Sequence, residues 1–134
     1  MGQLRDRDYV ALARFRYALR VFERFSERAA RSHGVTPAQH QLLLAVRGYP
    51  FEGPPSISGV AELLQQRVHS VVELVDRAVE SGLVEKEHDP DDRRRQLLRV
   101  TKAGERLLER LSADHREELR RSRRQLADVL AALD

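Results

Sequence analysis

The amino-acid sequence predicts a mainly α-helical fold with one small β-hairpin. Three observations support this prediction. Long stretches near both ends carry apolar residues at helical spacing, shorter helical segments between them are separated by glycine and proline, and one later segment is typical of two strands around a turn. A chain of 134 residues fits one domain, 1–134, with a core of its own.

The segment from Leu4 to about Ser32 is predicted to be one long amphipathic helix that ends at Gly34. Its apolar residues recur three, four and five positions apart, as on one face of a helix. These residues are Val10, Phe15, Ala18, Leu19, Phe22, Phe25 and Ala29.

A second helix is predicted to begin at Pro37. Thr36 can cap it, proline suits the first helical position, and Gln39 can complete a capping box. The loop 48–55 then breaks the helix, because it holds two glycines and three prolines. The residues expected to face inward are Leu42, Leu43, Ala45 and Val46.

Two further helices follow, joined by a short polar turn. Ser56 or Ser58 can cap the first of them, and the turn 65–67 leads into a helix over 68–81. Gly82 is expected to end this helix in a left-handed conformation. The residues that mark the first helix are Val60, Ala61, Leu63 and Leu64.

A β-hairpin and a final long helix complete the pattern. Strand-like segments over 83–88 and 93–101 flank a turn at 89–92, and Thr101 can cap a helix of about 30 residues. Two helices joined by a short turn and followed by a hairpin indicate a winged helix-turn-helix over about 36–101. The apolar side of the final helix comprises Leu107, Leu108, Leu111, Leu119, Leu126, Val129, Leu130 and Leu133.

The two long helices, about 4–32 and 102–133, are predicted to form a dimerisation region. Amphipathic helices of this length need a partner surface to cover their apolar sides, and a core of this size is too small to hide them. The alternative is that the two helices pack only against each other within one chain. We favour the dimer, since reading symmetric DNA half-sites requires two copies.

Composition argues against several classes of protein. There is no cysteine, which excludes disulfides and redox sensing through a thiol. No apolar run approaches the roughly 20 residues that span a bilayer, and the N-terminus is polar, so we expect a cytoplasmic protein. His88 and the acids at 89, 91 and 92 are residue types that could bind a metal in a catalytic site. Adjacent residues on a strand point to opposite faces, however, which argues against a shared site. We therefore predict no enzyme, no metal and no cofactor.

The basic residues are almost all arginine. The net charge is +3, and of 24 basic residues only Lys86 and Lys102 are lysines. The planar guanidinium group of arginine pairs well with phosphates and with guanine edges. A GC-rich genome would also favour arginine over lysine. Composition alone therefore does not establish DNA binding.

The helix over 68–81 is predicted to be the recognition helix in the major groove of DNA. Glu73 could accept a hydrogen bond from the amino group of cytosine, or it could form an ordinary surface ion pair with Arg77. The expected buried face comprises Val71, Val72, Leu74, Val75, Ala78 and Val79. The expected exposed face comprises His69, Ser70, Glu73, Arg77 and Glu80.

The hairpin turn carries the sharpest local signal. Acids at 89–92 are followed directly by Arg93, Arg94 and Arg95, so a tight turn would present cations at its tip. Such a tip fits a narrow A·T-rich minor groove. Asp89 or Asp92 is expected to brace one arginine by bidentate pairing.

Successive motifs over about 36–111 resemble the MarR (multiple antibiotic resistance regulator) family, and the Asp-Pro-x-Asp-Arg-Arg wing is the most specific of them. The resemblance implies a homodimer that binds a pseudo-palindromic operator and often loosens on binding a small aromatic or anionic ligand. It is carried by Val60-Ala61-Glu62-Leu63-Leu64, Leu74-Val75-Asp76-Arg77, Gly82-Leu83-Val84, Asp89-Pro90-Asp91-Asp92-Arg93-Arg94 and Leu98-Arg99-Val100-Thr101.

By position, the resemblance places DNA contacts on both the recognition helix and the wing. The sequence departs from the family pattern in the turn 65–68, which lacks the usual glycine and has Arg67 where a capping serine or threonine is common. Glu73 is also unusual, so the operator sequence cannot be borrowed from relatives. The implied contacts are Arg67, His69, Ser70, Glu73 and Arg77 on the helix and Arg93, Arg94 and Arg95 on the wing.

The resemblance also implies a ligand pocket near the junction of the first two helices. His33 and His40 lie there and could bind an anionic ligand or respond to pH, although such histidines are more often surface or core residues. The sequence thus predicts a homodimeric transcriptional regulator, expected to be a repressor, with or without an effector. The main alternative is a winged-helix protein-interaction module or anti-regulator that has lost DNA binding.

Overall fold

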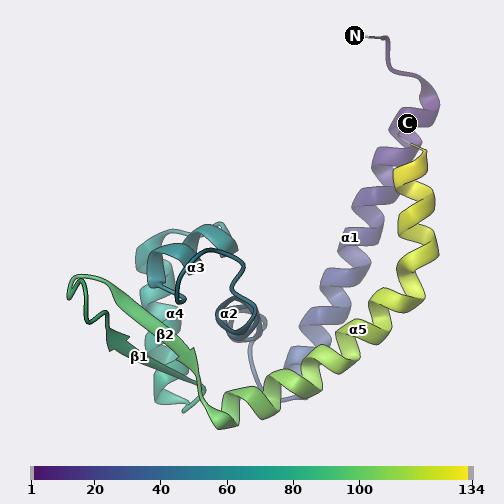
Figure 1. Ribbon diagram of the computed structural model, residues 1–134. Coiled ribbons are helices and arrows are strands. Elements are labelled where there is room, and N and C mark those ends of the chain that lie inside the picture. The colour runs from purple at the N-terminus through teal and green to yellow at the C-terminus, as the bar shows by residue number, and fades with distance from the viewer. Residues whose placement is uncertain (1, 133–134) are drawn as a thin grey trace.

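The computed structural model describes residues 2–132, and in this range it contains five helices and two strands (Figure 1). The mainly α-helical fold with one hairpin is therefore confirmed. In chain order the elements are α1 Asp6–Ser32, α2 Pro37–Arg47, α3 Ile57–Leu64, α4 Val68–Glu80, β1 Val84–His88, β2 Gln96–Val100 and α5 Lys102–Ala131.

The predicted helix starts agree closely with the structure. The Thr36 and Gln39 capping box opens α2, the Ser56 hydroxyl accepts from the Gly59 amide at α3, and Thr101 caps α5 in the same way. The first helix begins at Asp6 rather than at Leu4. Each cap accepts a hydrogen bond from a backbone amide that has no partner within the helix. Because capping depends only on neighbouring residues, these helix starts could be predicted from the sequence.

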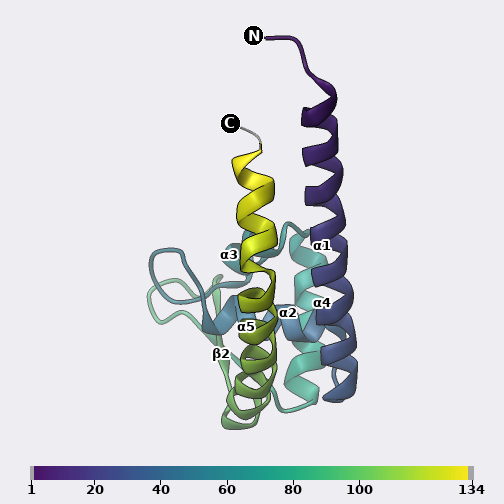
Figure 2. The same ribbon diagram turned by 90° about the vertical axis from the view of Figure 1, so that its right-hand side faces the viewer.

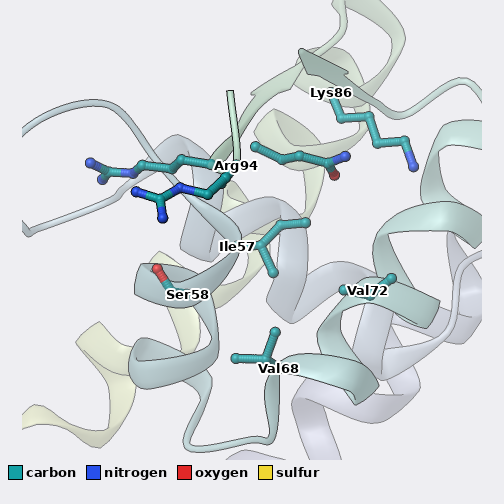
Figure 3. Close-up of a pocket in the computed structure, with 8 residues that line it drawn as sticks. Ile57, Ser58, Val68, Val72, Lys86 and Arg94 are labelled. Atoms are coloured by element: carbon teal, nitrogen blue, oxygen red, sulfur yellow. The ribbon is translucent and has the colours of Figure 1, made fainter. Parts of the chain in front are cut away.

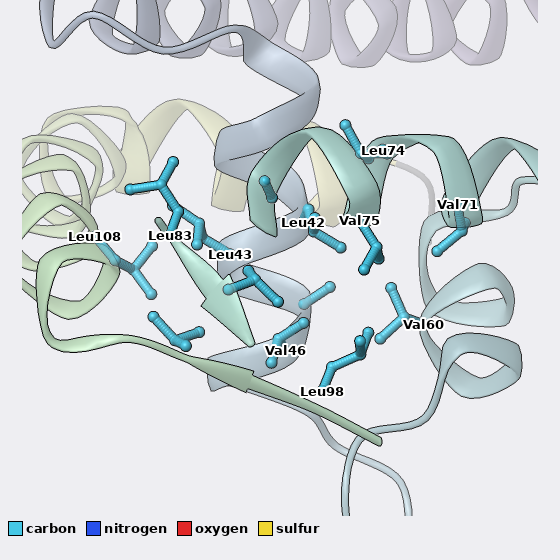
Figure 4. Close-up of a cluster of buried hydrophobic side chains, with 14 of the residues drawn as sticks. Leu42, Leu43, Val46, Val60, Val71, Leu74, Val75, Leu83, Leu98 and Leu108 are labelled. Atoms are coloured by element: carbon cyan, nitrogen blue, oxygen red, sulfur yellow. The ribbon is translucent and has the colours of Figure 1, made fainter. Parts of the chain in front are cut away.

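One apolar core holds α2, α3, α4, the hairpin and the first turns of α5 together (Figure 4). Leu42, Leu43, Val60, Val71 and Val75 are fully buried in it. The predicted inward face of α2 is confirmed. The predicted buried face of α4 was wrong at two positions, which are taken up below, because four apolar residues are enough to fill the space that α4 covers.

The hairpin is antiparallel and pairs Val84 with Val100 and His88 with Gln96. Its second strand begins at Gln96 rather than at Arg93, so all three wing arginines belong to the connecting loop 89–95. The Leu98 amide donates to the carbonyl of Pro55 at 2.9 Å, which ties the hairpin to the loop before α3. The wing therefore has a fixed base and a projecting tip.

The helices α1 and α5 run side by side and project away from the other elements (Figures 1 and 2). At the start of α5, a Cβ atom on Gly104 would lie 2.4 Å from the Leu83 carbonyl oxygen, so glycine permits the close approach of α5 to the hairpin. No helix in residues 2–132 is both long and apolar enough to cross a membrane.

Candidate nucleic-acid interface

The helix α4 presents its N-terminal end to solvent. Arg67, His69 and Glu73 are exposed, and Ser70 is half-buried. Arg67 is the N-cap residue, and its side chain makes no capping hydrogen bond. The Ser70 amide donates to the Arg67 carbonyl at 3.1 Å, whereas the Val68 and His69 amides have no acceptor among residues 2–132. The positive end of the helix dipole favours an anion such as a phosphate beside them.

The turn before α4 explains how the chain manages without the usual glycine. Gln65 adopts a left-handed conformation with φ of 53°, the only positive φ at a non-glycine residue in the described part of the chain. Its side-chain amide donates to the Glu62 carbonyl at 2.8 Å. This local hydrogen bond helps hold a conformation that glycine would adopt more readily.

Glu73 and Arg77 do not pair with each other. Both side chains are exposed, and neither forms an ion pair with any residue in the range 2–132. The nearby Asp76 instead accepts from the Lys86 ammonium of β1 at 2.8 Å. Of the two interpretations of Glu73, the ordinary i, i+4 ion pair is therefore not the one that the structure shows.

The wing loop is held by its own acids. One oxygen of Asp92 accepts from the backbone amide of Arg94 at 3.1 Å and from its Nε at 3.3 Å. Asp89 accepts from the Asp91 amide at 2.9 Å and forms no ion pair or hydrogen bond with an arginine side chain in the range 2–132. The predicted bidentate pairing was wrong in detail, because a single oxygen of Asp92 orients both the backbone and the side chain of Arg94.

The other two wing arginines form no ion pair within residues 2–132. Arg93 and Arg95 are exposed, and no acid in residues 2–132 lies within ion-pair distance of either. The carbonyl of Arg93 accepts from the ring of His88 at 2.9 Å, which fixes the backbone of the loop without occupying its guanidinium. The wing therefore offers two free guanidinium groups and one braced one.

A hollow of about 380 Å³ lies between the starts of α3 and α4 and the wing (Figure 3). Ile57, Val68 and Val72 give it an apolar floor. Lys86, Arg94 and Arg95 line the side formed by the hairpin and its loop, with Ser58 and Gln96 also in the lining. The hollow thus joins the recognition helix and the wing into one continuous face, which sequence reasoning did not anticipate.

A second hollow, of about 590 Å³, lies between α1, α2 and α5. His40 is buried beside it, with its ring centroid 4.7 Å from that of His115, and its Nδ1 has no hydrogen-bond partner among residues 2–132. Burial, and to a lesser extent the charge of His115, lowers the pKa of His40 to about 4. His40 is therefore neutral at pH 7.

The two histidines singled out from the sequence are separated. His33 does not line this hollow, and its Nε2 instead lies 3.1 Å from a carboxylate oxygen of Asp114. Sequence reasoning missed His115, whose Nδ1 donates to the Leu111 carbonyl at 2.7 Å and whose Nε2 lies 2.9 Å from the Ser26 hydroxyl. Nothing in the spacing of residues 33, 40 and 115 could have shown which pair meets, because only tertiary packing brings α2 and α5 together.

Comparison with known proteins agrees with this geometry. A model of the MarR family matches residues 33–95. A protein of Thauera aromatica assigned to transcriptional regulation of the hcr operon is 30% identical over 91 residues, covering 68% of this chain and 53% of that protein. The chain thus matches about half the length of this relative.

Two solved structures are similar in fold. A Staphylococcus aureus MepR mutant bound to an oligodeoxyribonucleotide has a TM-score of 0.67 and 19% identity, covering 90% of this chain and 95% of that one. CouR from Rhodococcus jostii RHA1, bound to p-coumaroyl-CoA, has a TM-score of 0.68 and 23% identity, covering 87% and 86%. The Thauera aromatica relative is a transcriptional regulatory protein by name rather than an enzyme, in line with the prediction that this chain is not an enzyme.

Proposed function

This chain belongs to the MarR family of transcription regulators, and from that premise we propose that it binds double-stranded DNA sequence-specifically as a homodimer. The observation that carries the proposal is the single face formed by the open end of α4 and the arginine loop of the wing. The bound oligonucleotide of the MepR mutant supports the same use of this fold.

Each part of this face suits a different part of the duplex. The N-terminal end of α4 would enter the major groove, where Arg67, His69 and Ser70 reach phosphates or base edges. Glu73 is free to accept from a cytosine amino group, since no residue in the range 2–132 pairs with it. The guanidinium groups of the wing loop would lie in the flanking minor groove.

Dimerisation is proposed through α1 and α5. Between these helices only Ala11 and Val129 are buried near their free ends, whereas large apolar side chains remain exposed along both helices. These include Tyr9, Val10, Leu12, Tyr17, Leu19, Val21, Leu119 and Leu130. A second copy of the chain would cover them, while residues 36–101 would form the DNA-binding unit. Leu133, expected in this region, lies outside the described residues.

A twofold dimer makes definite demands on its operator. Its two α4 helices would read an inverted repeat whose half-sites lie about one helical turn apart. Occupying such a site at a promoter would block transcription, so we propose a repressor that acts in the cytoplasm. The repressor role follows from occlusion alone and needs no other partner.

An effector is proposed for the hollow that His40 and His115 line. Phe22, Leu19 and Leu44 make it apolar, whereas Glu23 and Glu27 contribute carboxylates. Because His40 is neutral at pH 7 and Glu23 and Glu27 line the hollow, it suits an aromatic ligand that is neutral or cationic better than an anion. We therefore propose such a ligand in place of the anion that the sequence suggested for His33 or His40.

Selection of the purified protein against random duplexes at two salt concentrations tests the proposal. We expect an inverted repeat to be enriched and its affinity to fall steeply with salt, because several arginines release counterions from DNA. If no duplex were enriched even at low salt, a protein-interaction module without DNA binding would replace this proposal.

Two substitutions then separate positioning from specificity. We expect Arg94→Ala to weaken binding to many sequences alike, and Glu73→Ala to change base preference more than overall affinity. Arg28→Ala, which removes an exposed arginine of α1 far from the wing, is the matched control for lost charge. Equal losses in Arg94→Ala and Arg28→Ala would remove the wing from the interface.

A further inference from the structure

Three valines of α4 are exposed: Val68 by 51%, and Val72 and Val79 by 36% each. The helical pattern places Val72 and Val79 with the core, but the structure leaves them outside it. On a helix that otherwise presents polar and charged residues, this exposed apolar strip has no partner among residues 2–132. Such surface is costly in water unless a binding partner covers it.

Val68 and Val72 sit at the N-terminal half of α4, where they form the floor of the hollow beside the wing (Figure 3). Lys86, Arg94 and Arg95 line the side of the hollow that the hairpin and its loop form, and Arg95 has no ion-pair partner within residues 2–132. An apolar patch beside cationic side chains suits a ligand with an apolar group close to negative charges. A DNA strand has this character where a base edge carries a hydrocarbon group and phosphates lie on either side.

The major groove presents one apolar group, the C5-methyl of thymine, and its other base-edge groups are hydrogen-bond donors and acceptors. We propose that Val68 and Val72 select thymine in each half-site by contacting this methyl group. The inference rests on the proposed function, in which α4 enters the major groove. It adds an apolar element to an interface otherwise built from charged and polar residues.

Val79 provides an internal control. It is a valine with the same exposure as Val72, but it lies seven residues further along α4, or about 10 Å at the rise of an α-helix. Recognition helices contact base edges mainly through their N-terminal residues. Val79 therefore lies beyond the predicted base contacts, and its truncation removes the same atoms without removing a methyl contact.

The experiment replaces each thymine of the selected duplex in turn with deoxyuridine, which removes only the C5-methyl. Binding is measured for the unmodified protein and for Val68→Ala, Val72→Ala and Val79→Ala, with thermal unfolding as a check on folding. At one or two positions per half-site we expect deoxyuridine to weaken the unmodified protein about fourfold, the effect of burying one methyl group. Val68→Ala or Val72→Ala should abolish that difference, and Val79→Ala should keep it.

The possible outcomes separate the inference from the function on which it rests. Binding to a selected duplex without any methyl effect that depends on Val68 or Val72 would overturn the inference and leave DNA binding intact. A methyl effect that survives both substitutions, or is lost equally in Val79→Ala, would also overturn it. Failure to select any duplex would overturn both.

Discussion

The winged helix-turn-helix and the pair α1 and α5 differ in how completely they bury their own apolar residues. In the first region, α2, α4 and the hairpin enclose Leu43 and Val75 entirely. In the second, two helices of 27 and 30 residues bury little of each other, and large apolar side chains face solvent. The first region thus buries its apolar residues within a single chain, while the second leaves apolar surface for which we propose a second copy of the chain.

This contrast should be plainest on the two neighbouring leucines of α2. Leu43 is fully buried and Leu44 is 51% exposed. We expect Leu43→Ala to lower the free energy of unfolding by about 3 kcal/mol, since it removes buried methyl groups and leaves a cavity. Leu44→Ala should change it by less than about 1 kcal/mol, as chemical denaturation would show. Similar losses would mean that α2 is packed on both sides.

The second largest effect concerns the junction of the two regions, where His40 lies. Its pKa is about 4 in the folded protein and 6.5 when unfolded, so between these values the unfolded chain binds a proton that the folded protein does not. Stability is therefore lost as pH falls from 7, by about 2 kcal/mol at pH 5.

His40→Leu is the matched variant for this measurement. Denaturant unfolding at pH 7 and pH 5 should show a smaller decrease for His40→Leu than for the unmodified protein. The same decrease in both would mean that other groups cause the pH dependence.

Gly104 lies where α5 leaves the core, and it should give the next largest effect. A methyl group there would meet the Leu83 carbonyl oxygen at 2.4 Å and a Val100 methyl at 2.7 Å. We expect Gly104→Ala to cost about 1 to 2 kcal/mol through displacement of α5. The control is Gly2→Ala, because nothing lies within 4 Å of that position. Unchanged thermal stability in Gly104→Ala would show that α5 is not held closely against the hairpin.

The smallest effect belongs to the turn before α4. Gln65→Gly removes the strain of a left-handed backbone at a non-glycine residue, but it also removes the hydrogen bond to Glu62 and raises the entropy of the unfolded chain. Because these effects oppose one another, the free energy of unfolding should stay within about 1 kcal/mol of that of the unmodified protein. Calorimetry would measure this. A large loss would show that the side-chain hydrogen bond, rather than the backbone, maintains the turn.

Sequence reasoning succeeded where local chemistry decides the structure. The caps at Thr36, Ser56 and Thr101 and the stop at Gly82 depend on neighbouring residues, and all four are found in the structure. It failed at Val72, since helical periodicity cannot tell how wide a face the rest of the protein will cover.

The same limit applies to the candidate sites. The wing arginines could be identified from one short motif, but loop geometry decides which of them an acid braces. The contact between His40 and His115 joins residues 75 positions apart, and no local pattern records it. Pairings of that kind are set by the packing of α2 against α5 rather than by sequence spacing.

The central claim is that one region binds DNA while the other joins two copies of the chain. Sedimentation velocity of the protein, alone and with a selected inverted-repeat duplex, tests it most directly. We predict a dimer in the absence of DNA and a complex of two chains per duplex. A monomer that binds each half-site independently would contradict the claim, because the exposed apolar faces of α1 and α5 would then have another purpose.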